Sequence, residues 1–489
     1  ERRGFTTNSE LGQWLHNIAT AAPRGPTQAS VLQLGASQQG EPILGLLLTR
    51  AKGMDMASLE ANGRSTVVLI GQQHGDEPAG SEALLVVARE LAQGLLEPLL
   101  DRINVVVIPR ANPDGATNGN RTTANGVDMN RDHLLLNTPE ARALARVVRD
   151  YRPILVLDAH EFTVAGRYLQ KFNAIQRYDA LLQYTTTANY HEFLTKASQE
   201  WYHQPMLGAL QSQGMSSEWY YTTSTQPDDK RISMGGVQPD TGRNVNGLKN
   251  AVSLLVETRG VGLGRLHIQR RVHTQVTTIT SALRSTAERA ADLEQVRSYV
   301  ARDTASKACK GQVVIEAQAT PMQRELTMLD PDTGADRTLK VDWNSSLALR
   351  PVKSRPRPCG YWLAAHATAA VERLQMLGVQ VLRIAEPGAL LADTYHETAR
   401  ETTERTDVRG TIAGGSSIIR TQVTPVRSAI DVPAGSFYVP LNQGLAHLAV
   451  AALEPDTQSS YFANRLIDEL GSTARVMTVP SLVFEESDE

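Results

Sequence analysis

Residues 66–77 read TVVLIGQQHGDE, an apolar run followed closely by a histidine and a glutamate three positions apart, His74 and Glu77. A short apolar run of this kind predicts a buried strand, so both polar side chains stand at a strand end. Zn²⁺ accepts nitrogen and oxygen ligands, and a catalytic zinc site needs three protein ligands and one open position. A second histidine is therefore required downstream. Taken alone, the pair also fits a surface loop with a stray histidine.

The missing ligand is His160, which follows a second apolar run. The two runs bring their polar ends together if they are neighbouring strands of one sheet, because the carboxyl ends of parallel strands share a crevice. Two further runs end in the same way. Residues 104–108 lead to the turn sequence NPDG at 112–115, and residues 253–256 lead to Glu257. Four predicted strand ends thus each deliver a polar group.

The order of elements predicts the fold class. Strand-like runs near residues 66, 104, 154 and 252 alternate with helix-like stretches at 82–93, 139–150 and 190–201. Such alternation predicts an α/β fold, a doubly wound mixed and largely parallel sheet with helices on both faces. A helix over 9–20 and a hairpin over 31–48 are predicted before the first of these strands. The polar, periodic stretch 263–306 predicts one long helix or two consecutive ones.

A composition change after this stretch predicts a domain boundary. We assign residues 1–306 to a catalytic domain and residues 307–489 to a smaller mixed α/β domain of unknown role, since 489 residues exceed one ordinary core. The second region begins with a strand-like run at 312–317. It also holds a predicted helix at 369–377 that stops at Gly378 and runs into a predicted strand at 379–382.

The motifs resemble those of the zinc carboxypeptidase family, the carboxypeptidase A/B-like metallopeptidases, and in particular bacterial-type members with a C-terminal extension. The residues that carry the resemblance are HGDE at 74–77, NPDG at 112–115, Arg121, DMNR at 128–131, His160 and Glu257. Their order and spacing make the combination specific, although each motif alone is weak. The resemblance covers about the first 300 residues and implies a zinc-peptidase-like fold.

Carried over residue by residue, the resemblance implies one Zn²⁺ per chain, held by His74, Glu77 and His160. It makes Asp128 the carboxylate that accepts the free ring N–H of His74 and so fixes its tautomer. It makes Glu257 the general base. The implied reaction is hydrolysis of the C-terminal peptide bond by a zinc-activated water, with Glu257 passing the proton to the leaving amine.

Three further polar residues gain roles from the same resemblance. Arg121 resembles the family's oxyanion stabiliser, which acts together with zinc. Asn130 and Arg131 resemble the pair that grips the substrate's terminal carboxylate, a task that suits the planar fork of arginine. Taken singly, both arginines also fit solvated charges, and Glu257 also fits a strand-end carboxylate paired with Arg259.

The chain departs from the family at the tyrosine that closes over the substrate. That tyrosine usually lies some twenty residues before the general base, yet none occurs between Lys230 and Glu257. The nearest are Tyr220 and Tyr221, for which a buried aromatic cluster is favoured over a displaced equivalent. A second departure is that only 82 residues separate Glu77 from His160, fewer than in the digestive enzymes of the family, so the loops that shape the pocket are shorter. The preferred substrate side chain therefore does not transfer from the family.

The loop at 235–244 precedes the Glu257 strand and is expected to form a specificity wall, because its glycines allow a convoluted path. We predict that Arg243 lines the site, where it would favour an acidic side chain. Asp240 would instead favour a basic one. The alternative for both is an exposed loop.

Composition restricts the classes of binding partner and the cellular location of the protein. The net charge of −3 argues against a nucleic-acid partner, and no apolar run reaches the length of a membrane span. The start at Glu1 rather than methionine is expected of a mature or trimmed form from which any signal peptide has been removed, and it limits the assignment of a location. A periplasmic or secreted location is slightly favoured over a cytoplasmic one. The two cysteines, Cys309 and Cys359, either form a disulfide or are separate buried thiols. The oligomeric state is left open.

Three functions therefore stand. The first is a zinc metallocarboxypeptidase whose partner is a peptide with a free C-terminal carboxylate. The second is an N-acyl amino acid amidohydrolase on the same fold. The third is a catalytically inactive peptide-binding module, which the presence of Glu257 and all three ligands disfavours. The NPDG and DMNR motifs favour the first over the second.

Overall fold

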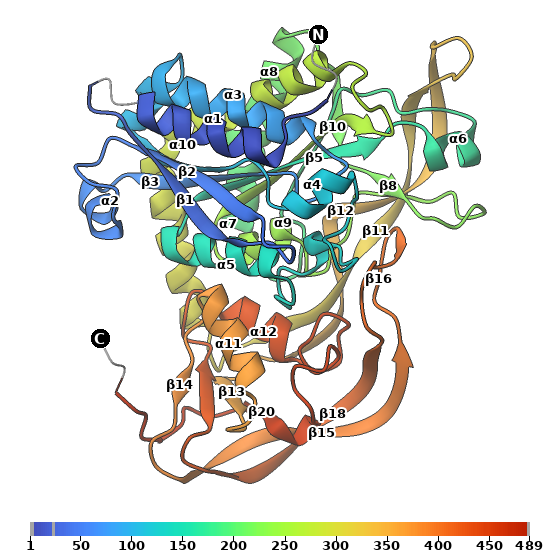
Figure 1. Cartoon of the computed structure of the whole chain (residues 1–489). Coiled ribbons are helices and arrows are strands. Elements are labelled where there is room, and N and C mark those ends of the chain that lie inside the picture. Colours follow the sequence, from blue (N-terminus) through green and yellow to red (C-terminus); the bar gives the residue numbers. More distant parts are fainter. Residues whose placement is uncertain (1–3, 22–24, 487–489) are drawn as a thin grey trace.

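The computed structural model describes residues 4–21 and 25–486 (Figure 1). Its centre is an eight-stranded sheet. The strands are β1 (Gln28–Ala36), β2 (Pro42–Thr49), β3 (Ser65–Gly71), β4 (Ile103–Ile108), β5 (Leu155–Thr163), β6 (Ala180–Tyr184), β7 (Ser217–Trp219) and β10 (Val252–Val261). They lie in the order β1-β2-β4-β3-β5-β10-β6-β7. The four central strands β4, β3, β5 and β10 run parallel to one another.

Helices cover both faces of this sheet. They include α1 (Asn8–Ala21), α2 (Met56–Asn62), α3 (Ala79–Gln93), α5 (Pro139–Tyr151), α7 (Glu192–Ala197), α8 (Gln204–Ser212) and α10 (Ile268–Ser306). Successive strand residues point to opposite faces. Val67 and Leu69 pack with α1, α3 and α10, whereas Val68 and Ile70 pack with α2 and α5. The predicted α/β class, with a mixed and largely parallel sheet, is confirmed.

Local predictions were mostly correct. The helix at 9–20, the hairpin over 31–48 and the single long helix within 263–306 are all present. The stretch 190–201 is not one α-helix, because α7 ends at Ala197 and a π-helical turn follows (Ser198–His203). The strand predicted at 379–382 was wrong over 379–381. Val379 donates its backbone N–H to Leu374 at the end of the preceding helix and is not available to a strand ladder.

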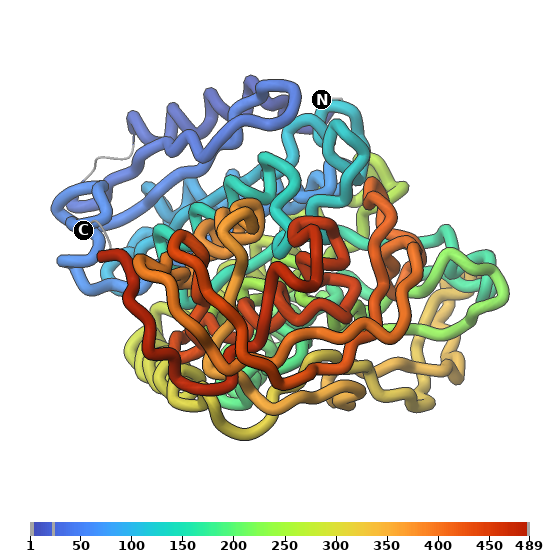
Figure 2. The backbone as a smooth tube through the Cα atoms, turned by 90° about the horizontal axis from the view of Figure 1, so that it is seen from below, coloured from blue at the N-terminus to red at the C-terminus, as the bar shows by residue number. Residues whose placement is uncertain are grey.

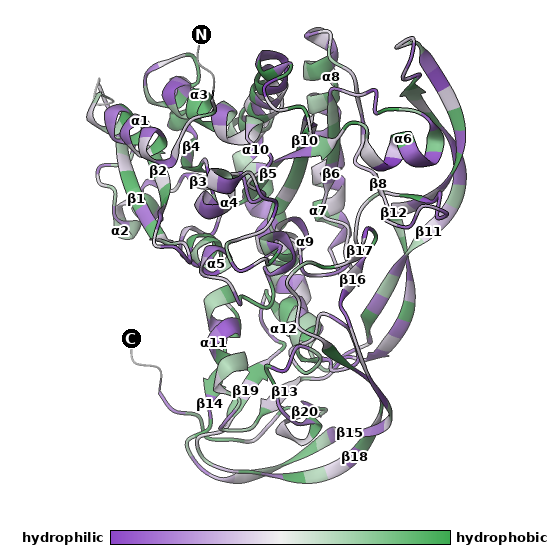
Figure 3. Ribbon diagram, turned by 45° about the vertical axis from the view of Figure 1, so that its right-hand side comes forward, coloured by the Kyte–Doolittle hydropathy of each residue, from purple (hydrophilic) through white to green (hydrophobic). Residues whose placement is uncertain are grey.

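The C-terminal region forms its own sheet against two helices, α11 (Thr368–Leu377) and α12 (Ala446–Leu453). Its strands are β13 (Gly360–Leu363), β14 (Leu382–Arg383), β15 (Gly388–Thr403), β18 (Ile418–Val432), β19 (Phe437–Pro440) and β20 (Thr473–Val476). They lie in the order β14-β19-β13-β20-β15-β18. Figure 3 shows α12 as largely hydrophobic, as expected for a helix whose residues are mostly buried. This region is the smaller mixed α/β unit that was predicted.

Two long hairpins connect this region to the rest of the molecule. In the first, β11 (Gln312–Leu329) pairs with β12 (Asp336–Pro356). β12 also pairs with β9 (Ile232–Ser233) of the N-terminal region, and β9 pairs with β8 (Thr222–Thr223). One hydrophobic cluster therefore contains Trp343 from the hairpin and Tyr221 from the N-terminal region. Because packing is continuous across residue 306, the boundary drawn there stays a prediction.

The second hairpin, β15 with β18, carries a small projection that we call the tip, residues 404–413. The tip contains β16 (Thr406–Asp407) and β17 (Gly410–Thr411). Figures 1 and 2 both place this orange segment beside the cyan loops of the N-terminal region. Hydrogen bonds agree, since the N–H of Asp128 donates to the carbonyl of Ala413 over 3.2 Å. A C-terminal segment thus reaches a sequence motif of the N-terminal region.

Shorter helices fill the connections. They are α4 (Pro113–Asn118), α6 (Gly166–Phe172) and α9 (Gly242–Leu248), with 3-10 turns at Glu97–Asp101, Met129–Arg131 and Leu470–Ser472. Cys309 and Cys359 form a disulfide, which decides between the two alternatives for these cysteines. Among the helices described here, none combines the length and the apolar character needed to cross a bilayer.

A buried histidine predicts how stability changes with pH. The ring of His203 stacks on Trp219 at 3.8 Å, is 7% exposed, and its Nε2 has no hydrogen-bond partner in the described part of the chain. Burial lowers the pKa of His203 to about 4. The unfolded chain binds this proton near pH 6.5, so the stability contribution is present above that pH and is lost as pH falls toward 4.

We therefore expect His203→Phe to flatten the acid side of the stability profile. Between pH 7 and pH 5 the wild type should lose about 2 kcal/mol more unfolding free energy than the variant. Denaturant melts at both pH values measure the difference. His366→Gln, at a mostly exposed side chain, is the control. Parallel profiles for the wild type and His203→Phe would contradict the assignment.

Candidate functional site

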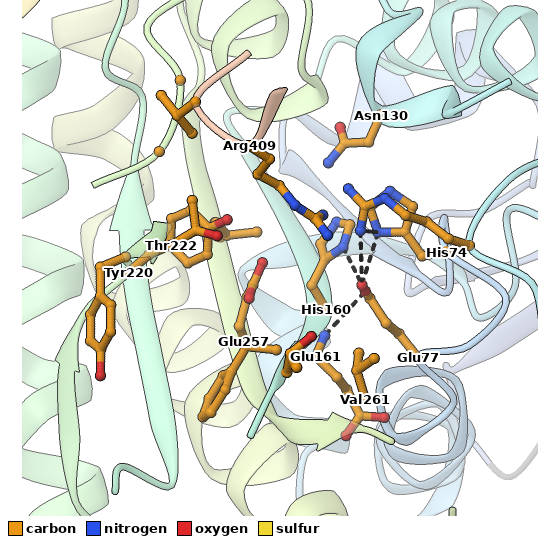
Figure 4. Close-up of a pocket in the computed structure, with 18 of the residues that line it drawn as sticks. His74, Glu77, Asn130, His160, Glu161, Tyr220, Thr222, Glu257, Val261 and Arg409 are labelled. Carbon is orange, nitrogen blue, oxygen red and sulfur yellow. Dashed lines mark hydrogen bonds and ion pairs between the residues drawn. The ribbon is translucent and has the colours of Figure 1, made fainter. Parts of the chain in front are cut away.

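The three predicted ligands converge at the carboxyl ends of β3 and β5. The Glu77 carboxylate lies between two imidazoles, with Oε1 2.9 Å from Nδ1 of His74 and Oε2 2.9 Å from Nδ1 of His160. Candidate ligand atoms of the three residues all lie within 4.8 Å of one another, and all three residues are buried (Figure 4). Residues 86 positions apart in the chain meet because β3 and β5 are adjacent parallel strands.

Each of the two histidines also contacts an aspartate through its Nε2 atom. Nε2 of His74 lies 2.8 Å from Oδ1 of Asp128, as predicted. Nε2 of His160 lies 3.0 Å from Oδ1 of Asp158, a close charge contact that is poorly aligned for a hydrogen bond. Carboxylates in these positions orient the rings so that both Nδ1 atoms face the centre. Sequence reasoning missed Asp158, although strand alternation places it on the same side of β5 as His160.

The donor set fits zinc. Two imidazole nitrogens and one carboxylate oxygen, with no fourth protein ligand in this cluster of described residues, are the arrangement of a catalytic zinc site with an open position. Burial raises the pKa of Glu77, but the neighbouring His74 and His160 outweigh burial and hold it well below its usual range. The carboxylate is therefore ionised, as a metal ligand must be.

The NPDG motif holds the His74 loop in place. The Asn112 side chain donates from Nδ2 to the carbonyls of Gln73 and Thr122, both over 3.1 Å. Gly75 and Gly115 pack backbone to backbone, so that a Cβ on Gly75 would lie 1.9 Å from the carbonyl carbon of Gly115. No larger residue fits at Gly75, and the motif acts by positioning the loop.

Arg121 lies beside the predicted ligands and is tied to the same aspartate as His74. Its Nε donates to Oδ2 of Asp128 over 3.0 Å, and its Nη1 lies 3.7 Å from Oε1 of Glu77. Burial lowers the pKa of Arg121, but the two carboxylates raise it further, so the guanidinium is a fixed positive charge. This paired position differs from the solvated charge that was the alternative.

Asn130 and Arg131 also line the cavity. The Asn130 side-chain oxygen accepts the N–H of Gly242 over 3.0 Å, which leaves its NH₂ group for the cavity. Arg131 is not solvated either. Its Nε donates to Oδ2 of Asp407 in the tip over 2.8 Å, and its Nη1 donates to the carbonyl of Asn130 over 2.7 Å. Part of the predicted carboxylate-binding fork is therefore engaged within the protein.

Glu257 faces the cavity from β10, directly opposite His160 in the register of β5 and β10. Its side chain has no hydrogen bond or ion pair with any described residue, and the residue is 8% exposed. Burial, and then the charge of Glu77, raise the pKa of Glu257 to about 8. Arg259 donates instead to the carbonyl of Gln176, so the alternative Glu257–Arg259 pair does not form.

The predicted specificity residues are buried rather than exposed. Arg243 lines the cavity, and its guanidinium donates to the carbonyls of Tyr184 and Gly236 over 3.2 and 3.1 Å. Burial lowers the pKa of Arg243 to about 10. Asp240 is paired with Arg405 of the tip at 3.1 Å and does not line the cavity.

The two candidate tyrosines differ in what holds them. Tyr221 is 1% exposed and its hydroxyl donates to Gln176, so it belongs to the buried aromatic cluster that was favoured. Tyr220 is half-buried and lines the cavity, packed so closely against Gly235 that a Cβ there would lie 2.8 Å from its ring. Burial, then Glu257, raise the pKa of Tyr220 to about 12.

The cavity also contains two residues that sequence reasoning missed, Val408 and Arg409. Both belong to the tip, and Figure 4 shows Arg409 extending toward His74 and His160. No local pattern in the sequence marks them, because the tip reaches the site only through the fold of the C-terminal region.

Comparisons with known proteins match this chain to a family model, to curated relatives and to solved structures. Residues 11–234 match the family model described as zinc carboxypeptidase. Carboxypeptidase 2 of Trichophyton rubrum is 27% identical over 399 residues, which cover 81% of this chain and 72% of that protein. Carboxypeptidase D of Mus musculus is 29% identical over 228 residues, covering 38% and 16%. The solved carboxypeptidase A of Helicoverpa armigera is 15% identical with a TM-score of 0.43, covering 58% of this chain and 74% of that one.

The family match and the buried ligand cluster are separate observations, and both indicate a zinc site. The matched residues include the His74 loop, Arg121, the DMNR segment and His160, and they end before Glu257. Residues 11–234 are a zinc carboxypeptidase domain, and the protein is a zinc metallocarboxypeptidase, a hydrolase.

Proposed function

We propose that this protein removes the C-terminal residue of peptides that end in a free carboxylate. The single observation that carries the proposal is the cavity in which Glu257, without a partner among the described residues, faces the His74–Glu77–His160 cluster. Those three residues would hold one Zn²⁺ per chain. Bound there, zinc would acidify a water molecule and polarise the scissile carbonyl.

The protein's own residues supply the rest of the chemistry. Glu257 takes the proton of the attacking water and returns it to the leaving amine, for which a raised pKa near the working pH is favourable. Arg121 donates hydrogen bonds to the developing oxyanion, while Asp128 keeps the guanidinium in position. Asn130 and Arg131 bind the substrate's terminal carboxylate with the part of their donor set that remains free.

Arg243 acts as a wall of the side-chain pocket in this proposal. Its guanidinium is hydrogen-bonded to two backbone carbonyls and so has a fixed position in the cavity wall. Its positive charge favours an acidic substrate side chain. A periplasmic or secreted location is also proposed. The Cys309–Cys359 disulfide supports it, since disulfides persist in oxidising compartments.

Product analysis tests the proposal directly. The zinc-loaded full-length protein is incubated with N-benzoylglycyl amino acids and, separately, with simple N-acetyl amino acids, and products are identified by mass spectrometry. We expect release of the terminal amino acid from the first group at a kcat/KM at least about tenfold higher. Preference for the second group would instead support the N-acyl amino acid amidohydrolase, and tight binding without turnover would support the inactive module.

A further inference from the structure

The arginines of the cavity differ in how far their guanidinium groups are already engaged. Five arginines line it. Four of them have partners within the protein: Arg121 with Asp128, Arg131 with Asp407, Arg167 with the carbonyl of Thr223, and Arg243 with the carbonyls of Tyr184 and Gly236. The guanidinium of Arg409 has no hydrogen bond or ion pair to any residue in the described ranges 4–21 and 25–486. Arg409 therefore keeps its whole fork free.

The position of Arg409 suits an anionic group of the substrate. The residue is half-buried, and Figure 4 shows its guanidinium between Asn130 and Glu257, above the ligand cluster. It is close enough to affect the charge of Glu257, whose pKa it lowers against the larger effects of burial and of Glu77. An arginine fork binds a carboxylate through two parallel hydrogen bonds.

The ion pairs around the tip leave the side chain of Arg409 without a carboxylate partner among the described residues. Arg131 is neutralised by Asp407 at 2.8 Å, and Arg405 is neutralised by Asp240 at 3.1 Å. Both pairs are largely buried. Asp407 also accepts the backbone N–H of Arg409 over 2.8 Å, but this bond leaves the side-chain charge of Arg409 uncompensated. A substrate carboxylate would supply the missing negative charge.

The tip is fixed to the N-terminal region on several sides. The carbonyl of Arg409 accepts the N–H of Thr225 over 2.9 Å, and Arg405 donates to the carbonyl of Arg131 over 2.9 Å. Gly414, just beyond the tip, has φ +72°, and a Cβ there would lie 2.5 Å from the carbonyl oxygen of Gly126. A side chain carried on such a segment is pre-organised, which lowers the entropic cost of binding.

We propose that Arg409, contributed by the C-terminal region, binds the terminal carboxylate of the peptide substrate together with Asn130 and Arg131. Asp407 restrains Arg131, and Arg409 supplies the fork that this restraint removes. The inference rests on the proposed carboxypeptidase function and extends it. It also gives the C-terminal region a role, because the carboxylate site is incomplete without the tip.

The test compares ligands that differ only in the carboxylate. Calorimetry measures binding of 3-phenylpropanoate and of its carboxamide to the zinc-loaded full-length protein, for the wild type and for Arg409→Gln. We expect Arg409→Gln to weaken binding of the acid about 10- to 100-fold and to leave binding of the carboxamide within about twofold. Arg409→Lys, which keeps the charge but lacks the fork, should fall between.

Arg420→Gln is the matched control, since it removes an exposed arginine from the same region and should bind both ligands as the wild type does. An unchanged affinity for the acid in Arg409→Gln would overturn the proposal, and tighter binding would identify the tip as a barrier. If Arg409→Gln fails to fold, the acid-to-carboxamide ratio of Arg409→Lys decides, and a ratio equal to that of the wild type overturns the proposal.

Steady-state kinetics distinguishes carboxylate binding from other roles that Arg409 could have in the site. With N-benzoylglycyl substrates, Arg409→Gln should raise KM about equally for terminal phenylalanine and terminal glutamate. A rise in KM confined to terminal glutamate would show that Arg409 recognises the substrate side chain. A loss in kcat alone would show that Arg409 stabilises the oxyanion. Absence of any turnover in the wild type would refute the proposed function, whereas the binding comparison above would still report on Arg409.

Discussion

Glu257→Gln is expected to lower kcat for peptide hydrolysis by about 10²- to 10⁴-fold, the usual contribution of a general base. The substitution keeps the size of the side chain and its place in β10 but removes the group that accepts a proton. Because Glu257 has no partner in the described chain, its loss should leave the fold intact. Zinc content, measured by mass spectrometry of the digested protein, should stay at one per chain.

A control variant and two alternative outcomes test this prediction. Glu401→Gln, at an exposed side chain of β15, is the matched control and should retain full turnover. Unchanged kcat in Glu257→Gln at full zinc occupancy would remove Glu257 from the role of base. A parallel loss of zinc would show that Glu257 contributes to metal binding instead.

Removal of the metal is expected to abolish hydrolysis and to lower the unfolding temperature. Glu77 and two imidazoles meet in a buried cluster, and a cation that binds only the folded state stabilises it by about 4 kcal/mol at a thousandfold excess over Kd. Dialysis against a chelator, followed by calorimetric melting and activity assays, measures both effects. Stoichiometric zinc should restore them.

Asp158→Asn gives a graded version of the same experiment. It removes the charge that contacts Nε2 of His160 but replaces none of the predicted ligands, and such changes typically weaken metal affinity about 10- to 100-fold. Zinc titration against a competing chelator measures this change. Full activity in protein shown to contain no metal would disprove the metal-dependent mechanism, and unchanged affinity in Asp158→Asn would show that Asp158 does not tune the site.

Sequence reasoning worked where local rules control the geometry. The runs before His74 and His160 were predicted as buried strands, and parallel pairing then placed both side chains at one edge of the sheet. It was less successful where backbone hydrogen bonds have competing uses. Val379 satisfies its N–H at the end of α11, so the apolar pattern that predicted a strand at 379–382 had no ladder to join.

The sequence alone determined the catalytic fold and placed His74, Glu77 and His160 at strand ends, because strand periodicity and the order of strands fix where a residue at a strand end will lie. Their roles as ligands came from the resemblance to the family and stay predictions. Only the tertiary structure decided how Arg131 is used, since its partner Asp407 lies 276 residues away. The same holds for Arg409. A contact between segments so far apart depends on how two sheets pack, and no local spacing in the sequence encodes that packing.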